Sequence, residues 1–253
     1  MPEAARAHFA TATARGARLR AAWEARWRDW ALAQPELAAE WRRMEAGSLP
    51  AHWDAELPHF EAGKEVATRV AGGKAITAIA KRVPEILGGD ADLSVSTNTA
   101  LEGLGSFDGR TGIGRNIHYG VREHAMGAIA NGIVYHGGPR PFVATFFCFA
   151  DYMRPAVRLA ALCELPVIYV WTHDSIGLGE DGPTHQPVEH LAALRAMPGM
   201  TLLRPCDANE AVEAWRFAMR QREGPIGIVL SRQKLPVLDR TRLGAAAELA
   251  RGA

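Results

Sequence analysis

Glu123 is the residue whose position in this sequence most strongly suggests chemistry. It follows a glycine-rich stretch, residues 109–120, and precedes an apolar pattern at helical spacing that begins at Ala125. A carboxylate at such a place can be an ordinary first-turn glutamate, which the helix dipole favours. It can also be a catalytic acid, because burial raises the pKa of a carboxyl group. The segment alone leaves both interpretations open.

Two later segments combine aromatic, acidic and imidazole side chains. Residues 144–153 read ATFFCFADYM, and residues 172–187 read THDSIGLGEDGPTHQP. Aromatic rings suit a flat heterocyclic ligand, and a few polar groups would fix its orientation. The histidines and carboxylates of the second segment could also suggest a metal. However, the Ile-Gly-Leu-Gly run between them gives no standard ligand spacing, so we predict no metal site there.

Alternating secondary structure must position these segments. From Gly63 onward, β-rich runs alternate with helical patterns, which predicts a doubly wound, mainly parallel α/β sheet. In such sheets, ligands bind beyond the carboxyl ends of the strands, where the polar segments fall. The predicted strands are 85–93, 141–147, 166–172, 201–204 and 226–231, and the predicted helices are 64–83, 122–135, 152–163, 189–197 and 208–221.

The N-terminal part of the chain has a different composition. Residues 1–62 contain five of the seven tryptophans, with arginines between them and apolar residues at roughly helical spacing over 18–34. Pro35 restarts the pattern as a shorter helix. We therefore expect a helical arm over 1–62, a domain over 63–240 and an alanine-rich tail over 241–253. The arm should cover an apolar surface, either of its own domain or of another chain.

Composition excludes several classes of protein. The net charge of +1 gives no electrostatic case for a nucleic-acid partner. No run approaches the roughly 20 apolar residues that a membrane span needs, and no secretory signal precedes the arm. The three cysteines are widely spaced, which favours reduced thiols over disulfides. We expect a cytoplasmic protein.

The motifs closely resemble those of one enzyme family. Segments reading GGDADLSVS (88–96), YGVREHAMG (119–127) and LSRQKLP (230–236), together with the two segments quoted above, resemble the pyrimidine-binding (middle) domain of transketolase. This resemblance implies a thiamine diphosphate-binding fold of the pyrimidine type, with residues 1–62 as the linker that precedes it. It also implies the transfer of a two-carbon ketol unit from a ketose phosphate to an aldose phosphate.

The resemblance further implies roles for individual residues. Glu123 would place its carboxyl group against the aminopyrimidine ring of thiamine diphosphate, and His185 would join it as a catalytic residue. Without the resemblance, Arg69 would be interpreted as a solvated charge at a helix start, and the aromatic residues as core packing. The matched residues form two further groups, the cofactor-binding Asp92, Phe146, Phe149 and Tyr152 and the substrate-binding Arg69, Ser96, His173, Asp181 and Arg232.

Other parts of the family's site have no match in this sequence. In the family, a Gly-Asp-Gly motif with a downstream asparagine holds the diphosphate and Mg²⁺, and that motif does not occur here. We therefore expect a complementary chain to carry the diphosphate and Mg²⁺ ligands, in an oligomer that acts on sugar phosphates. Two alternatives remain open: an inactive truncated product that serves as an assembly or regulatory subunit, and a ketol transferase similar to dihydroxyacetone synthase.

Overall fold

The computed structural model describes residues 1–252 and divides into two compact units, the first ending at Ser48 and the second beginning at Leu49. The first unit consists of helix α1 (Glu3–Ala33) and helix α2 (Pro35–Glu45), with Pro35 at the first helical position of α2. Helix α1 begins earlier than the sequence pattern suggested. Its first residues are mostly alanine and arginine, which are strong helix formers.

The tryptophans of the first unit pack against one another. The ring centroid of Trp27 lies 6.0 Å from that of Trp23, 5.0 Å from that of Trp30 and 5.5 Å from that of Trp41. The aromatic residues that suggested a covering arm therefore form a small cluster of their own, which joins α1 to α2.

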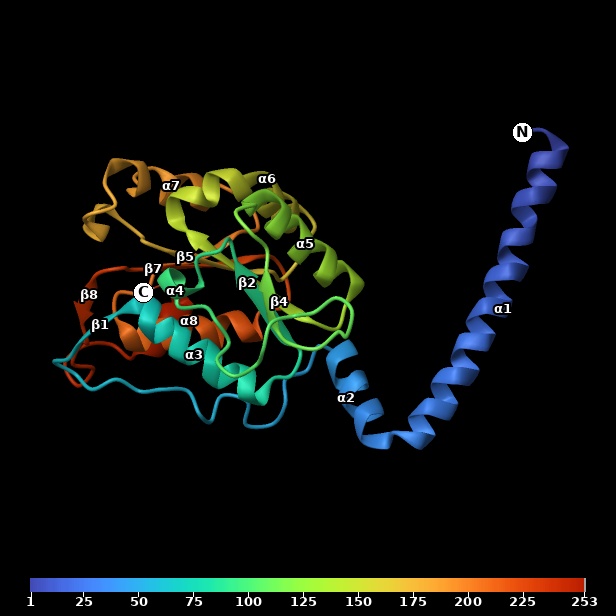
Figure 1. Cartoon of the computed structure of the whole chain (residues 1–253), viewed down its shortest axis with the longest axis horizontal. Helices are drawn as coiled ribbons and strands as arrows, with labels where there is room; N and C mark the ends of the chain where they lie inside the picture. The colour runs from blue at the N-terminus through green and yellow to red at the C-terminus, as the bar shows by residue number, and fades with distance from the viewer. Residues whose placement is uncertain (253) are drawn as a thin grey trace. The chain divides into compact units, whose positions relative to one another are not determined.

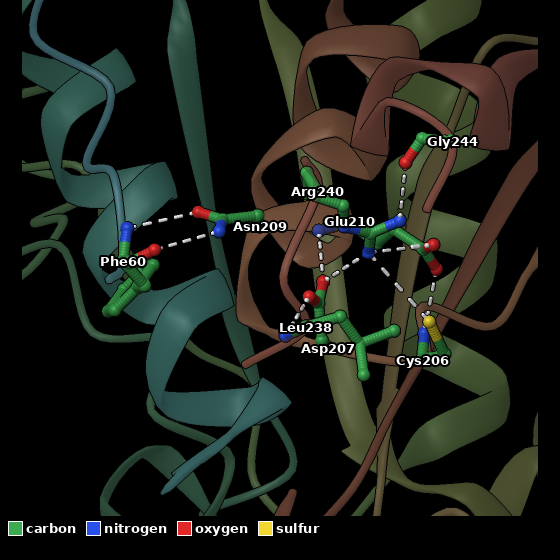
Figure 2. Close-up of polar contacts among 8 residues, drawn as sticks. All are labelled: Phe60, Cys206, Asp207, Asn209, Glu210, Leu238, Arg240 and Gly244. Atoms are coloured by element: carbon green, nitrogen blue, oxygen red, sulfur yellow. Dashed lines mark hydrogen bonds and ion pairs between the residues drawn. The ribbon is translucent and has the colours of Figure 1, made fainter. Parts of the chain in front are cut away.

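Residues 49–62 belong to the second unit by their contacts. Trp53 is buried in its core, and Leu49, Leu57 and Phe60 pack against the same cluster. The backbone of Phe60 both donates to and accepts from the Asn209 side chain, at 3.0 and 2.9 Å (Figure 2). The contacts thus divide the chain at Ser48, whereas the sequence pattern changes near residue 62.

A parallel sheet forms the centre of the second unit. Its order is β3-β2-β4-β5-β7-β6, and every pairing in it is parallel, which confirms the predicted α/β class. The middle strands are buried along their whole length or nearly so, as expected for a sheet covered on both faces. The strands are β2 (Ile86–Asp90), β3 (Asn116–His118), β4 (Arg140–Phe146), β5 (Ile168–Thr172), β6 (Thr201–Leu203) and β7 (Ile226–Leu230).

Helices cover both faces of this sheet (Figure 1). On one face, α3 (Thr68–Arg82) packs against α8 (Ala208–Arg220), with Ile76, Ile79 and Trp215 among the fully buried side chains. On the other face, α5 (Glu123–His136) packs against α6 (Ala150–Leu162). This arrangement places the first turns of α3 and α5 near the carboxyl ends of the strands.

Several short segments differ from the sequence-based expectation. Residues 65–67 form strand β1 (Glu65–Ala67), which pairs antiparallel with β8 (Lys234–Pro236), so that α3 begins at Thr68 rather than Lys64. Strand β3 was not expected, because Asn-Ile-His is too short to show the alternation of apolar and polar residues that predicts a strand. The tail contains a 3₁₀ helix, η4 (Ala246–Arg251), whose Leu249 is buried in the same core cluster as α8.

The close packing of α5 on α6 depends on Gly127. A Cβ atom there would lie 2.9 Å from Met153 Cγ and 3.0 Å from Ala156 Cβ. We expect Gly127→Ala to lower the free energy of unfolding by about 1–2 kcal/mol, because the two helices must move apart. The matched control is Gly132→Ala in the same helix, where nothing lies within 4 Å. It should raise stability by about 0.5–1 kcal/mol in urea denaturation. Equal shifts for both variants would contradict this account.

Among residues 1–252, no helix is both long enough and apolar enough to cross a bilayer.

Candidate functional site

A cleft of about 570 Å³ opens at the carboxyl edge of the sheet. The carboxyl ends of β2, β4, β5 and β7 and the segments that follow them, including helix α4 (Ser94–Thr97), bring its side chains together with the start of α3. It contains all five residues that the sequence suggested for substrate binding, together with Phe146 and His185. The residues that line the cleft are Arg69, Val95, Ser96, Phe146, His173, Glu180, Asp181, His185 and Arg232.

Two guanidinium groups converge in this cleft. Arg69 lies in the first turn of α3 and donates to the carbonyl oxygen of Ser96, while its Nε atom is buried with no hydrogen-bond partner among the described residues. Burial lowers the pKa of Arg69, and the positive charge of Arg232 lowers it further. Two cations held close together and partly desolvated form a site that favours an anion, above all a phosphate that accepts paired N–H donors.

His173 follows β5 in a left-handed conformation, with φ of 60°, which costs free energy in a residue other than glycine. Its ring stacks on Phe146 with the centroids 3.7 Å apart. Nδ1 lies 2.9 Å from Thr172 Oγ1, and Nε2 lies 3.7 Å from an Asp181 carboxylate oxygen. Burial, with the charge of Arg69 second, lowers the pKa of His173 to about 4. A neutral imidazole therefore faces the cleft at neutral pH.

This depressed pKa predicts a pH dependence of stability. The folded state binds fewer protons than the unfolded state between about pH 4 and the ordinary histidine value of 6.5, so stability should fall as the pH drops through this window. We expect His173→Gln to flatten that part of a pH series of unfolding midpoints. We also expect Arg69→Gln to raise the pKa of His173 in an NMR titration of its ring protons. If His173 in the folded protein titrates with a midpoint near the ordinary histidine value of 6.5, its pKa is not lowered and this prediction is wrong.

Aromatic rings form one wall beside the cleft. Phe146 and Phe149 stack with their centroids 6.1 Å apart, and His185 stands edge-on to Phe149 at 5.3 Å. Phe149 lies in a short 3₁₀ helix, η1 (Phe147–Phe149), that continues into α6. Tyr152, in the first turn of α6, contacts Phe149 but is 66% exposed. The group offers ring faces and edges against which a flat heterocycle could stack.

Glu123 lies at the start of α5 and is 7% exposed. Thr145 Oγ1 on β4 donates to its carboxylate at 3.5 Å. Its negative charge also contributes to raising the pKa of the Cys148 thiol to about 11, although burial is the main cause, so Glu123 lies near the aromatic wall. A glutamate favoured only by the helix dipole needs no burial. A buried carboxyl group with one weak hydrogen bond still has an oxygen atom that can contact a ligand.

Four of the predicted residues do not line the cleft: Phe149 and Tyr152 in the aromatic wall, Glu123 at the start of α5, and Asp92. Two residues that were not predicted do line it. Asp92 follows β2 with φ of 60°; it is exposed and does not line the cleft. Val95 and Glu180 do line it, and Glu180 forms an ion pair with Arg232. The only sequence signal for Glu180 was its place beside Asp181 in a glycine-flanked loop. That signal does not reveal a partner 52 positions away in the chain.

Comparisons with known proteins agree on one domain. Residues 64–237 match the model of the family described as "Transketolase, pyrimidine binding domain". The chain is 52% identical to a transketolase of Geobacillus stearothermophilus over 242 residues, which cover 95% of this chain and 36% of that protein. It is also 52% identical to a transketolase of Mycobacterium tuberculosis over 247 residues, covering 92% of this chain and 35% of that protein. The chain thus spans about a third of the length of these relatives.

Solved structures show the same similarity. A Pichia stipitis transketolase in complex with sedoheptulose-7-phosphate superimposes with a TM-score of 0.91 at 42% identity, covering 99% of this chain and 38% of that one. A structure described as a split-gene transketolase, an inactive β4 tetramer, superimposes with a TM-score of 0.57 at 29% identity. That second match covers 70% of this chain and 55% of the other.

Proposed function

This chain belongs to the transketolase family through its pyrimidine-binding domain, and on that premise we propose that it supplies the pyrimidine half of a thiamine diphosphate-dependent ketol-transfer site. The observation that carries the proposal is the cleft at the carboxyl edge of the sheet. There Arg69, Arg232 and neutral His173 converge beside an aromatic wall that leads to buried Glu123. These groups suit a phosphorylated sugar on one side and a flat ring on the other.

The cleft residues divide the binding of a sugar phosphate between them. Arg69 and Arg232, with Ser96, would hold the phosphate group, because two guanidinium groups close together favour a dianion. Asp181 and His185 would contact the sugar hydroxyls, since both are polar and line the same cleft. His173, uncharged and held by its stacking on Phe146, would donate or accept a hydrogen bond without adding a third positive charge.

The aromatic wall and Glu123 fit the pyrimidine ring of thiamine diphosphate. Phe146 and Phe149 would stack on or stand against the ring, and exposed Tyr152 and Asp92 could reach it from the rim. Glu123 would hold a proton at its carboxylate against a ring nitrogen, with Thr145 keeping the side chain in place. The bound cofactor supplies an electron sink for the carbanion of the transferred two-carbon unit.

A complementary polypeptide would supply the groups that bind the diphosphate and the oxygen ligands of Mg²⁺. Among residues 1–252, neither of the two clusters of possible metal ligands lies in this cleft. The similarity to a split-gene transketolase supports an arrangement of separate chains in one oligomer.

Reconstitution tests the proposal. The purified chain is mixed with a chain that carries the diphosphate-binding domain, thiamine diphosphate, Mg²⁺, a ketose phosphate and an aldose phosphate. We expect ketol transfer only in the complete mixture, and weak calorimetric binding of thiamine diphosphate to this chain alone. A stable complex without turnover would favour an assembly subunit instead. Turnover with formaldehyde as a better acceptor than aldose phosphates would favour a dihydroxyacetone synthase-like enzyme.

A further inference from the structure

One of the two arginines of the cleft already has an anionic partner. The Arg232 guanidinium pairs with Glu180, a residue that the expected site did not include. The side chain of Glu180 is 77% exposed and that of Arg232 is 33% exposed. Glu180 therefore reaches from the surface across the mouth of the cleft to a cation within it.

The loop that carries Glu180 allows its side chain to move away from Arg232. It lies between two short 3₁₀ helices, η2 (Ile176–Leu178) and η3 (Pro183–His185). Gly179 and Gly182 flank the Glu180–Asp181 pair with φ of 89° and 74°, and nothing lies within 4 Å of a Cβ placed at either glycine. No packing on these glycines fixes the loop, and Glu180 has few contacts that would hold its carboxylate in place.

We propose that Glu180 is a built-in competitor for the anionic group of the substrate. Its carboxylate occupies Arg232 while the cleft is empty and leaves when a phosphate binds. This inference rests on the proposed function, because it assumes that the two arginines receive a phosphate group. It adds a residue whose role is to weaken that binding.

The charge and the exposure of Glu180 indicate that it competes with the phosphate for Arg232. They do not fit a residue that positions Arg232 for the phosphate. A phosphate monoester carries close to two negative charges near neutral pH and can accept from both arginines, whereas Glu180 carries one charge and, among residues 1–252, pairs with Arg232 alone. An exposed ion pair contributes little free energy, so the phosphate displaces it at a small cost. That cost is subtracted from the affinity for every ligand that needs Arg232.

Phosphate binding to the chain itself provides the test. Inorganic phosphate is titrated into the wild type and Glu180→Gln at fixed pH and ionic strength, and the dissociation constants are read from chemical shifts. Glu180→Gln should bind phosphate roughly 1.5- to 5-fold more tightly, the range that an exposed ion pair accounts for. The matched control is Glu61→Gln, which removes an exposed carboxylate paired with Lys64 outside the cleft and should change nothing.

A second pair of variants separates the possible failures. Arg232→Gln should weaken phosphate binding, and adding Glu180→Gln to it should give no further change, because the competitor then has no target. Unchanged or weaker binding by Glu180→Gln alone would overturn the inference, and weaker binding would make Glu180 a residue that prepares Arg232. If Arg232→Gln binds phosphate as well as the wild type, the proposed substrate site itself is wrong.

Discussion

Replacing Glu123 by glutamine should lower kcat of the reconstituted enzyme by about 10²- to 10⁴-fold, the usual contribution of a positioned acid or base. Glutamine keeps the size of the side chain and can still accept from Thr145, but it cannot exchange a proton with a ring nitrogen. The fold should survive, because Glu123 makes one long hydrogen bond of 3.5 Å. The measurement is the initial rate of ketol transfer at saturating thiamine diphosphate, beside a thermal unfolding curve.

A second first-turn glutamate gives the matched control for this prediction. Glu36 occupies the first turn of α2, as Glu123 does in α5, and it is exposed. Glu36→Gln should therefore leave the rate unchanged. If Glu123→Gln also keeps full activity, the helix-dipole interpretation of this carboxylate is sufficient and the catalytic one is wrong.

Removing the carboxylate of Asp207 should destabilise the second unit by about 3 kcal/mol, near the lower end of the loss expected when one partner of a buried charge pair is deleted. Asp207 is fully buried at the N-cap of α8 (Figure 2). It accepts from the backbone N–H of Glu210 at 2.8 Å and of Leu238 at 3.0 Å, and it lies 3.0 Å from the Arg240 guanidinium. Asp207→Ala would leave all three groups short of a partner.

The exposed Asp239 is the control for Asp207. It follows Leu238 directly, and among residues 1–252 its side chain hydrogen-bonds to Thr241 alone, in the same turn. Asp239→Ala should not measurably change the midpoint of urea denaturation, whereas Asp207→Ala should lower it clearly. Similar midpoints for the two variants would show that the carboxylate of Asp207 contributes little, because Arg240 keeps its existing ion pair with Glu210.

The sequence predicted those parts of the fold that depend on long local patterns. Strands such as Ile168–Thr172 are continuous apolar runs between glycine- or proline-marked loops, and their central place in a parallel sheet follows from that pattern. Strand β3 could not be predicted, because its three residues are ordered by pairing with β2 rather than by their own preference. The same holds for β1 and β8, which form strands only through each other.

The candidate site was predictable to the extent that its residues follow strand ends. His173 comes directly after β5 and Arg232 comes two residues after the end of β7, and the parallel sheet brings those ends to one edge. The pairing of Glu180 with Arg232 and the left-handed backbone of His173 depend on how the loops close over that edge. No local pattern in the sequence encodes loop closure of this kind.

The first turn of α8 fastens two distant parts of the chain. Asn209 binds the backbone of Phe60, and Asp207 binds that of Leu238, so the segment before the first strand and the segment after the last strand are tied to neighbouring residues (Figure 2). When the two ends of a domain lie close together, the domain can be joined to other domains, separated from them or circularly permuted without a change in its sheet. Recombination between genes could therefore move this domain while its cleft stays whole.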